Sequence, residues 1–399
     1  MQPLKIEEIR KPPPGGFALF ALGFRPFFLG ASFAAVVLVA MWLVVYLGGF
    51  AIGYYPAPFN WHGHEMIFGY TVAVIAGFLL TAVGNWTNCV TAQGKTLALL
   101  FALWLAGRLA PLVSGVVPPW MVALVDLAFL PLLTVVLAIP LLRNRQPHNL
   151  VFIPVLGLFF VADLLVHLDV LGVATGWGPR GLDLGLNLTL LLITIMGGRV
   201  IPFFTERGVQ DFAARRWRVV EVLAVASVIG LLLGDVFGAP SVLTGALAVL
   251  AAAAHAARQA GWYTHRLWRV PLVWVLHTGY AWMIAGFALK ALAAVGVVAA
   301  GFAVHAFTTG AIGALTLGMM ARVSLGHTGR AMQSARAVNI AFAAVVAAAL
   351  LRVVAPLLVP QWYVALVTFS GGIWVLAFVL FAVVYAPILI RPRVDGRPG

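Results

Sequence analysis

The segment Trp61-His62-Gly63-His64-Glu65 places three ionisable side chains at the start of a long apolar run. Ionisable groups inside a bilayer are costly unless they are paired, so each one is a candidate functional residue. Neutral imidazole is a ligand for both haem iron and copper. We therefore predict that His62 and His64 are metal ligands. The alternative is a hydrated, interfacial helix start at which these side chains only cap exposed amides.

Helix geometry limits how these residues can share a site. Positions two apart on an α-helix point about 200° away from each other, so His62 and His64 cannot face the same site within one regular helix. His62 and Glu65 are three apart and are expected to share a face. Either two sites are served, or His62 lies in the turn that precedes the helix.

His305 opens another apolar run at a similar depth. Imidazoles at matched depth on different helices are typical of a membrane haem or copper site. Gly310, Gly313 and Gly318 follow, and such small residues would leave room for a flat macrocycle, although they suit close helix packing equally well. We predict that His305 is a third metal ligand.

The remaining histidines divide into two groups. His277 lies in the other half of its span, where it could serve a macrocycle or a second metal centre, or could be a buried histidine that bonds a neighbouring hydroxyl. Asp163 and His167 are four apart, which predicts a structural or proton-relay pair on one helix face. An ordinary interfacial role is expected for the three that lie near basic segments, namely His148, His255 and His265.

Several arginines fall within apolar runs, among them Arg25, Arg108, Arg199 and Arg322. An arginine there can pair a carboxylate of a cofactor bidentately, or it can extend to the interface. We keep Arg25, Arg199 and Arg322 as candidate cofactor-binding residues. For Arg108 we favour the interfacial role.

Composition defines the class of protein. Of 399 residues, 63% are hydrophobic and 9% are charged, whereas soluble chains average about 25% charged residues. Soluble enzymes and disordered proteins are therefore excluded. Cys89 is the only cysteine, so there is no intrachain disulfide and no thiolate cluster. No phosphate-binding loop and no Cys-x-x-Cys-His haem-attachment motif occurs, which leaves ATP-driven transport and covalent haem unsupported.

Apolar stretches of about twenty residues or more select membrane-spanning helices over barrel strands. The chain is predicted to be an all-α polytopic membrane protein in a single domain, 1–399, with a short segment 1–23 before the spans at 24–388 and a tail at 389–399. About twelve spans are expected, at 24–48, 62–88, 95–113, 119–142, 148–171, 182–205, 217–237, 240–260, 269–294, 300–323, 334–356 and 362–388.

Lys and Arg residues are concentrated in the loops on one side of the predicted spans. Segment 207–218 contains four arginines, whereas loops 49–61, 237–241 and 357–361 contain almost no Lys or Arg. The positive-inside rule then predicts that both termini are cytoplasmic. Topology thus explains the net charge of +13, and no nucleic-acid partner is expected; the partner is the lipid bilayer.

Several motifs resemble those of the NnrS family, and together they extend over almost the whole chain. The strings are Phe24-Arg25-Pro26-Phe27-Phe28, Trp61-His62-Gly63-His64-Glu65-Met66, Gly77-Phe78-Leu79-Leu80-Thr81-Ala82-Val83 with Asn85-Trp86-Thr87, Gly198-Arg199-Val200-Ile201-Pro202-Phe203-Phe204-Thr205, His277-Thr278-Gly279-Tyr280-Ala281-Trp282, His305 with Gly310-Ala311-Ile312-Gly313, and Arg322-Val323-Ser324-Leu325-Gly326-His327-Thr328-Gly329-Arg330.

The resemblance implies a bacterial inner-membrane protein of about twelve helices that contains haem and copper and belongs to the response to nitric oxide, often beside denitrification functions. The haem would be b-type, bound without a covalent link. Within the last motif, His327 is expected to lie near a cofactor edge. The ligand choices, His62, His64, His277 and His305, rest on depth and chemistry.

Three functions remain open. In the first, a haem or haem–copper centre reduces nitric oxide, with Glu65 as the catalytic proton donor and a quinol as a possible source of electrons. In the second, the protein is a sensor, a nitric oxide sink or a metal-handling protein without turnover. The third and least favoured is a secondary transporter with a site at broken helices near the midplane. The oligomeric state is not predicted.

Overall fold

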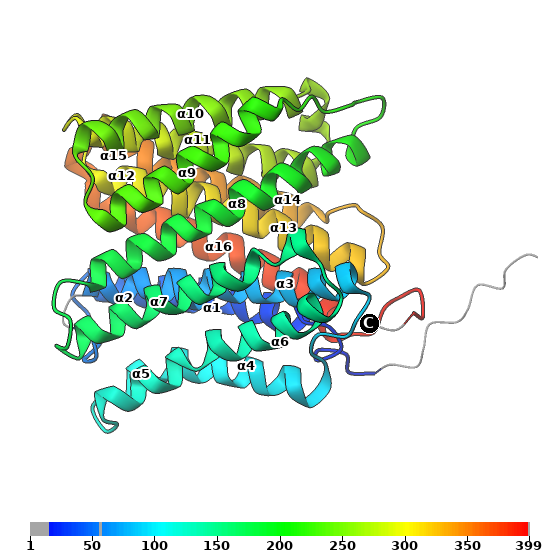
Figure 1. The fold of residues 1–399 in the computed structure, drawn as a ribbon, viewed down its shortest axis with the longest axis horizontal. Coiled ribbons are helices and arrows are strands. Elements are labelled where there is room, and N and C mark those ends of the chain that lie inside the picture. The colour runs from blue at the N-terminus through cyan, green and yellow to red at the C-terminus, as the bar shows by residue number, and fades with distance from the viewer. Residues whose placement is uncertain (1–15, 56–57, 398–399) are drawn as a thin grey trace, which may run out of the picture.

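The computed structural model describes residues 16–55 and 58–397. These residues form helices and no strand, and twelve helical segments are long and apolar enough to cross a membrane (Figure 1). The predicted fold class is confirmed, and the predicted spans agree with the helices to within a few residues at most ends. The twelve segments are α1 (Phe24–Tyr46); α2 (Pro58–His64), η1 (Glu65–Thr71) and α3 (Val72–Thr87); α4 (Gly94–Leu109) and η2 (Ala110–Val113); α5 (Pro119–Leu127) and α6 (Phe129–Arg143); η3 (Pro147–Asn149) and α7 (Phe152–Val170); α8 (Gly178–Gly208); α9 (Arg218–Phe237); α10 (Ser241–Trp262); α11 (Pro271–Ala294); α12 (Ala300–His305), η5 (Ala306–Ile312) and α13 (Gly313–His327); α14 (Arg336–Ala349), η6 (Leu350–Val354) and α15 (Ala355–Leu358); and η7 (Pro360–Trp362) and α16 (Tyr363–Ile390).

Local sequence explains where these helices end. Gly238 follows α9 with φ +70°, a left-handed conformation that glycine adopts without steric cost. Prolines stand at the first positions of α5 and α11, where no amide donor is needed. The surface of the bundle is apolar, as shown by the large exposed side chains Leu99, Phe369 and Val383. Such a surface fits a hydrocarbon environment.

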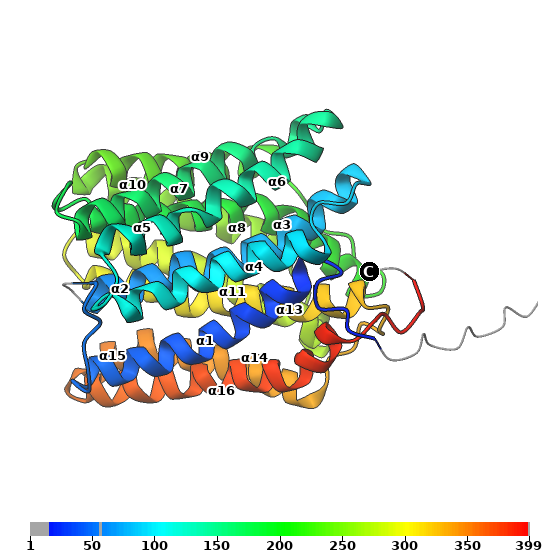
Figure 2. The same cartoon turned by 90° about the horizontal axis from the view of Figure 1, so that it is seen from below.

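The helices pack as one bundle in which neighbours in sequence are mostly neighbours in space. α1 lies against α3 and α16, and α16 also packs on α14. α8 joins α7 to α9, and α9 leads to the pair α10 and α11. α4, α5 and α6 lie at one edge of the bundle, with α9 to α11 at the far edge (Figures 1 and 2).

Both ends of the described chain lie at the same end of the bundle, which we call the terminal end (Figure 1). The Ala18 amide donates to the Ile390 carbonyl oxygen at 2.7 Å, and the Val394 amide donates to the Thr328 carbonyl oxygen at 3.1 Å. The arginine-rich loop that connects α8 to α9 also lies at the terminal end. The loops between α1 and α2, between α9 and α10 and between α11 and α12 lie at the other end, which we call the distal end.

Three π-helical segments, η1, η5 and η6, interrupt spans among the described residues. π-segments inside α-helices are frequent at functional sites. His64 directly precedes η1, His305 directly precedes η5, and Arg352 lies within η6. All three π-segments lie in the distal parts of their spans.

Candidate metal centre and histidine cavity

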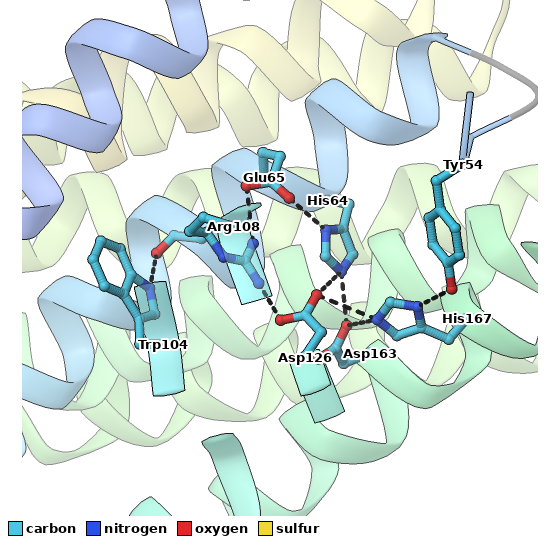
Figure 3. A network of polar contacts seen from close by, with 9 residues as sticks. Tyr54, His64, Glu65, Trp104, Arg108, Asp126, Asp163 and His167 are labelled. Atoms are coloured by element: carbon cyan, nitrogen blue, oxygen red, sulfur yellow. Dashed lines mark hydrogen bonds and ion pairs between the residues drawn. The ribbon is translucent and has the colours of Figure 1, made fainter. Parts of the chain in front are cut away.

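Four metal-ligating side chains from three spans meet inside the distal half of the bundle (Figure 3). They are His64 at the end of α2, Asp126 on α5, and Asp163 and His167 on α7. His64 Nε2 lies 2.9 Å from Asp163 Oδ1 and 3.3 Å from Asp126 Oδ2. His167 Nε2 lies 3.5 Å and 3.3 Å from the same two atoms. One ligand atom from each residue lies within 4.8 Å of the others, which is the spacing of a coordination shell.

A second layer of polar groups orients these ligands. Glu65 Oε1 lies 3.3 Å from His64 Nδ1, and Tyr54 Oη lies 2.9 Å from His167 Nδ1. A histidine that binds a metal through Nε2 donates its Nδ1 proton to such a partner. Tyr54 precedes the spans, and burial raises the pKa of its phenol, so Tyr54 remains neutral. Both imidazoles are thereby held with Nε2 toward the cluster.

Arg108 on α4 closes the network on its other side. Its guanidinium forms ion pairs with Asp126 and, at 3.0 Å, with Glu65 Oε2. The four cluster residues together with Glu65 and Arg108 are at most 7% exposed. Three buried carboxylates face one guanidinium, so two negative charges remain when the histidines are neutral. One divalent cation would cancel them.

Two glycines allow the backbones to approach this network. A Cβ at Gly107 would lie 2.5 Å from Asp126 Oδ1, and one at Gly69 would lie 2.9 Å from an Arg108 nitrogen and 3.0 Å from Glu65 Oε2. The Trp104 indole donates to the Gly69 carbonyl oxygen at 3.0 Å and so ties α4 to η1. The network is therefore built into the helix packing.

His62 and His305 belong to a second site, which lies on another side of α2 from the buried cluster. They line a cavity of about 330 Å³ with Asp183, Thr308, Thr309 and Arg352. The His62 ring stacks on Trp42, with centroids 4.5 Å apart and planes 13° apart. His305 Nδ1 lies 2.8 Å from the Gly301 carbonyl oxygen. Because that bond keeps the proton on Nδ1, Nε2 is the unprotonated atom and is competent as a ligand.

The structure thus separates the three predicted ligands at the distal end into two groups, while His277 lies elsewhere. His62 and His305 share the cavity, and His64 belongs to the buried cluster, as the 200° spacing allowed. The expectation that His62 and Glu65 share a face is wrong, because Glu65 begins η1 and contacts His64 and Arg108 instead. The Asp163–His167 pair is confirmed as a contact, but it is part of the larger cluster.

The other predicted site residues lie toward the terminal end. Arg25 donates to the carbonyl oxygens of Leu389 and Arg391 at 2.9 and 2.8 Å, where it binds the last turn of α16. Arg322 lies over the Phe204 ring at 3.8 Å. None of these contacts, with Leu389, Arg391 and Phe204, lies at the histidine cavity or at the buried cluster.

Three further predicted residues also occupy the terminal end. Arg199 reaches the Asn149 side-chain oxygen at 3.3 Å. His327 packs beside Phe24, with ring centroids 5.6 Å apart. His277 Nε2 bonds the Thr205 hydroxyl at 2.9 Å, which is the hydroxyl partner considered for it. Cofactor binding by Arg25, Arg199, Arg322, His277 and His327 stays a prediction.

Two residues that were expected at the membrane interface lie elsewhere in the structure. Arg108 does not extend to the interface, because α4 carries it to the distal end, where Asp126 and Glu65 neutralise it. His255 is not interfacial: it is fully buried, with Nδ1 2.5 Å from the Tyr280 hydroxyl. Sequence reasoning missed Asp126 entirely. The signal was present, since an aspartate within a span is as exceptional as a histidine.

The fold and these sites define a polytopic α-helical membrane protein with a buried cluster of histidines and aspartates that could hold a metal ion. The chain matches the family model described as "NnrS protein" over residues 18–393, nearly its full length. It belongs to the NnrS family, as the motifs indicated. No curated protein matches the chain.

Proposed function

We propose that this protein binds nitric oxide at a haem- and copper-containing site and removes it by reduction. The observation that carries the proposal is the buried set His64, Asp126, Asp163 and His167, whose ligand atoms all lie within 4.8 Å of one another. Nitrogen and oxygen donors without thiolate are the ligands typical of Cu(II). The resemblance of the motifs to the family supports the choice of copper.

The two sites differ in what they can hold. The Nε2 atoms of His64 and His167 both lie within 3.5 Å of Asp163 Oδ1, which leaves space for one ion and none for a macrocycle. The cavity of His62 and His305 has the size of small-ligand pockets, which start at about 300 Å³. We therefore assign copper to the cluster and haem to the cavity, where Arg352 can pair a propionate.

When bound, haem iron would supply an open coordination position for nitric oxide, and copper a one-electron redox centre. The protein's own groups do the rest. Tyr54 and Glu65 hold the two imidazoles of the cluster through their Nδ1 atoms. Arg108 holds the Glu65 and Asp126 carboxylates in place. As a proton donor, Glu65 would act through this network, since it contacts His64 rather than the cavity.

The overall reaction balances with a quinol. Two nitric oxide molecules, two electrons and two protons give one nitrous oxide and one water, and a quinol oxidised to a quinone releases two electrons and two protons. A quinol donor requires a respiratory membrane, so we place the protein in the bacterial inner membrane. The positive loops at the terminal end favour cytoplasmic termini.

The experiment compares wild type with His305→Ala and His64→Ala, purified in mild detergent, by visible spectroscopy and metal analysis. We expect His305→Ala to lose haem and keep copper, and His64→Ala to lose copper and keep haem. His265→Ala, an exposed histidine at the terminal end, is the matched control and should keep both. A wild-type protein without metal or colour would overturn the proposal.

Turnover separates reduction from storage. Wild-type protein supplied with excess quinol should consume nitric oxide continuously and form one nitrous oxide for each two molecules consumed. Consumption that stops at one equivalent per protein would contradict reduction and leave the non-catalytic sink in its place.

A further inference from the structure

A second cavity lies between the helices and is partly open toward the surface of the bundle; the described residues that line it include no histidine, carboxylate or arginine. It has a volume of about 120 Å³. We call it the dry chamber. Its walls come from α1, η1, α3, α7, α8, α11, η5 and α13, and include Phe28, Phe78, Leu192, Ile312 and Met319.

Among the described residues on its walls, the polar side chains are three threonines, and each hydroxyl forms a hydrogen bond. Thr71 donates to the Met66 carbonyl oxygen at 2.8 Å, and Thr189 to the Gly185 carbonyl oxygen at 2.9 Å. Thr316 donates to the Ile312 carbonyl oxygen at 2.6 Å. A water molecule in a cavity needs two or more polar partners, and these walls offer little to bond it. An apolar cavity of about 150 Å³ stays dry and takes up xenon or benzene.

The dry chamber lies directly beyond the histidine cavity along the same three elements. In η1 the lining passes from Ile67 at the cavity to Thr71 at the chamber. In α8 it passes from Leu186 to Thr189, and in η5 from Thr309 to Ile312. Steps of three or four residues advance about 5 Å along a helix. About one helical turn therefore separates the two spaces.

We propose that the dry chamber is a binding site for a small apolar gas and holds it one turn away from the histidine cavity. The volume and the apolar walls select for uncharged molecules that are poorly hydrated. The identification of that gas as nitric oxide rests on the proposed function. The chamber would raise the local concentration of the reactant beside the site at which it reacts.

Xenon is the probe, because it binds apolar cavities without any metal. We expect a crystal or cryo-cooled sample of wild-type protein under xenon pressure to show one xenon in the chamber. Leu192→Phe, which fills the chamber from α8, should abolish it. Leu233→Phe makes the same change at an exposed position of α9 and should leave xenon binding unchanged. Met319→Phe fills the chamber from α13 and replaces Leu192→Phe if that variant does not fold.

Ordered water or a lipid chain in the chamber, or xenon that persists in both filled variants, would overturn the proposal. Its failure can be told apart from failure of the proposed function. If the protein binds xenon but its visible spectrum does not change when nitric oxide is added, the gas site stands and the proposed reaction with nitric oxide fails. If the protein forms a nitric oxide complex but takes up no xenon, the proposed function stands and the gas site fails.

If both hold, Leu192→Phe should slow the rebinding of photolysed nitric oxide several-fold, while the visible spectrum of its complex stays that of wild type. The spectrum reports an intact haem site, so a change in rebinding alone locates the effect in the chamber. Rebinding at the wild-type rate would contradict a role in supplying the gas.

Discussion

His62 and His64 are two residues apart on α2, yet their surroundings are opposites. On the His64 side, carboxylates, imidazoles and a guanidinium lie within ion-pair distance of one another (Figure 3). On the His62 side, the imidazole stacks on one tryptophan and borders an open cavity. The same residue type, in the same helix, therefore has two different environments.

The contrast teaches that available space and unbalanced charge, rather than the presence of histidine, decide what a site can hold. The cluster has an excess of negative charge and room for one ion. The cavity has room, a histidine with a defined tautomer, and the cation Arg352. Each of these differences can be tested by a substitution that removes one of the charged groups.

The largest effect is expected from Asp126→Asn. This change leaves Arg108 buried beside a neutral amide, and breaking a buried ion pair by removal of one partner costs about 3–5 kcal/mol. Copper binding should be lost as well, and haem in the cavity should be retained. Unfolding in detergent together with metal analysis measures both.

The matched control is Asp211→Asn. Asp211 is exposed and has φ +50°, a conformation that asparagine tolerates, so this variant should unfold like wild type. Equal stability of the two variants would show that the Arg108–Asp126 pair contributes nothing to stability and would contradict this prediction.

An intermediate effect is expected from Glu65→Gln. The amide keeps the size of the side chain but weakens the acceptor for His64 Nδ1, and loss of such a partner typically lowers metal affinity about 10- to 100-fold. Competition with a chelator gives the affinity. If Glu65 is also the proton donor, turnover should fall further than copper occupancy; a fall in exact proportion to occupancy would restrict Glu65 to positioning the ligand.

An effect comparable in size to that of Glu65→Gln, but on haem instead of copper, is expected from Arg352→Gln. Loss of one charge-assisted hydrogen bond to a propionate costs about 1.5–3 kcal/mol of haem binding, with copper unchanged. Haem transfer to an acceptor protein measures the loss. Arg180→Gln removes a distal arginine that stacks on Trp177, outside the cavity, and should retain haem as wild type does. Identical haem retention in both variants would remove Arg352 from the site.

Buried pairing within single helices could be read from spacing, whereas pairing between helices could not. Asp163 and His167 are four residues apart, and their contact follows from helical geometry. Asp126 and Arg108 are on separate spans, and nothing local indicates that α4 and α5 bring them together. The same limit misplaced Arg108 and His255, whose partners come from neighbouring helices.

The sequence by itself determined the class of protein, the twelve spans, the segregation of positive charge and the family, because hydrophobic length and charge act locally along the chain. It also indicated that His62 and His64 could not share one face. Only the tertiary structure decided which residues meet: that His64 joins Asp126, Asp163 and His167, and that His62 joins His305. These contacts depend on which helices pack together. Packing at that level is a property of the whole bundle.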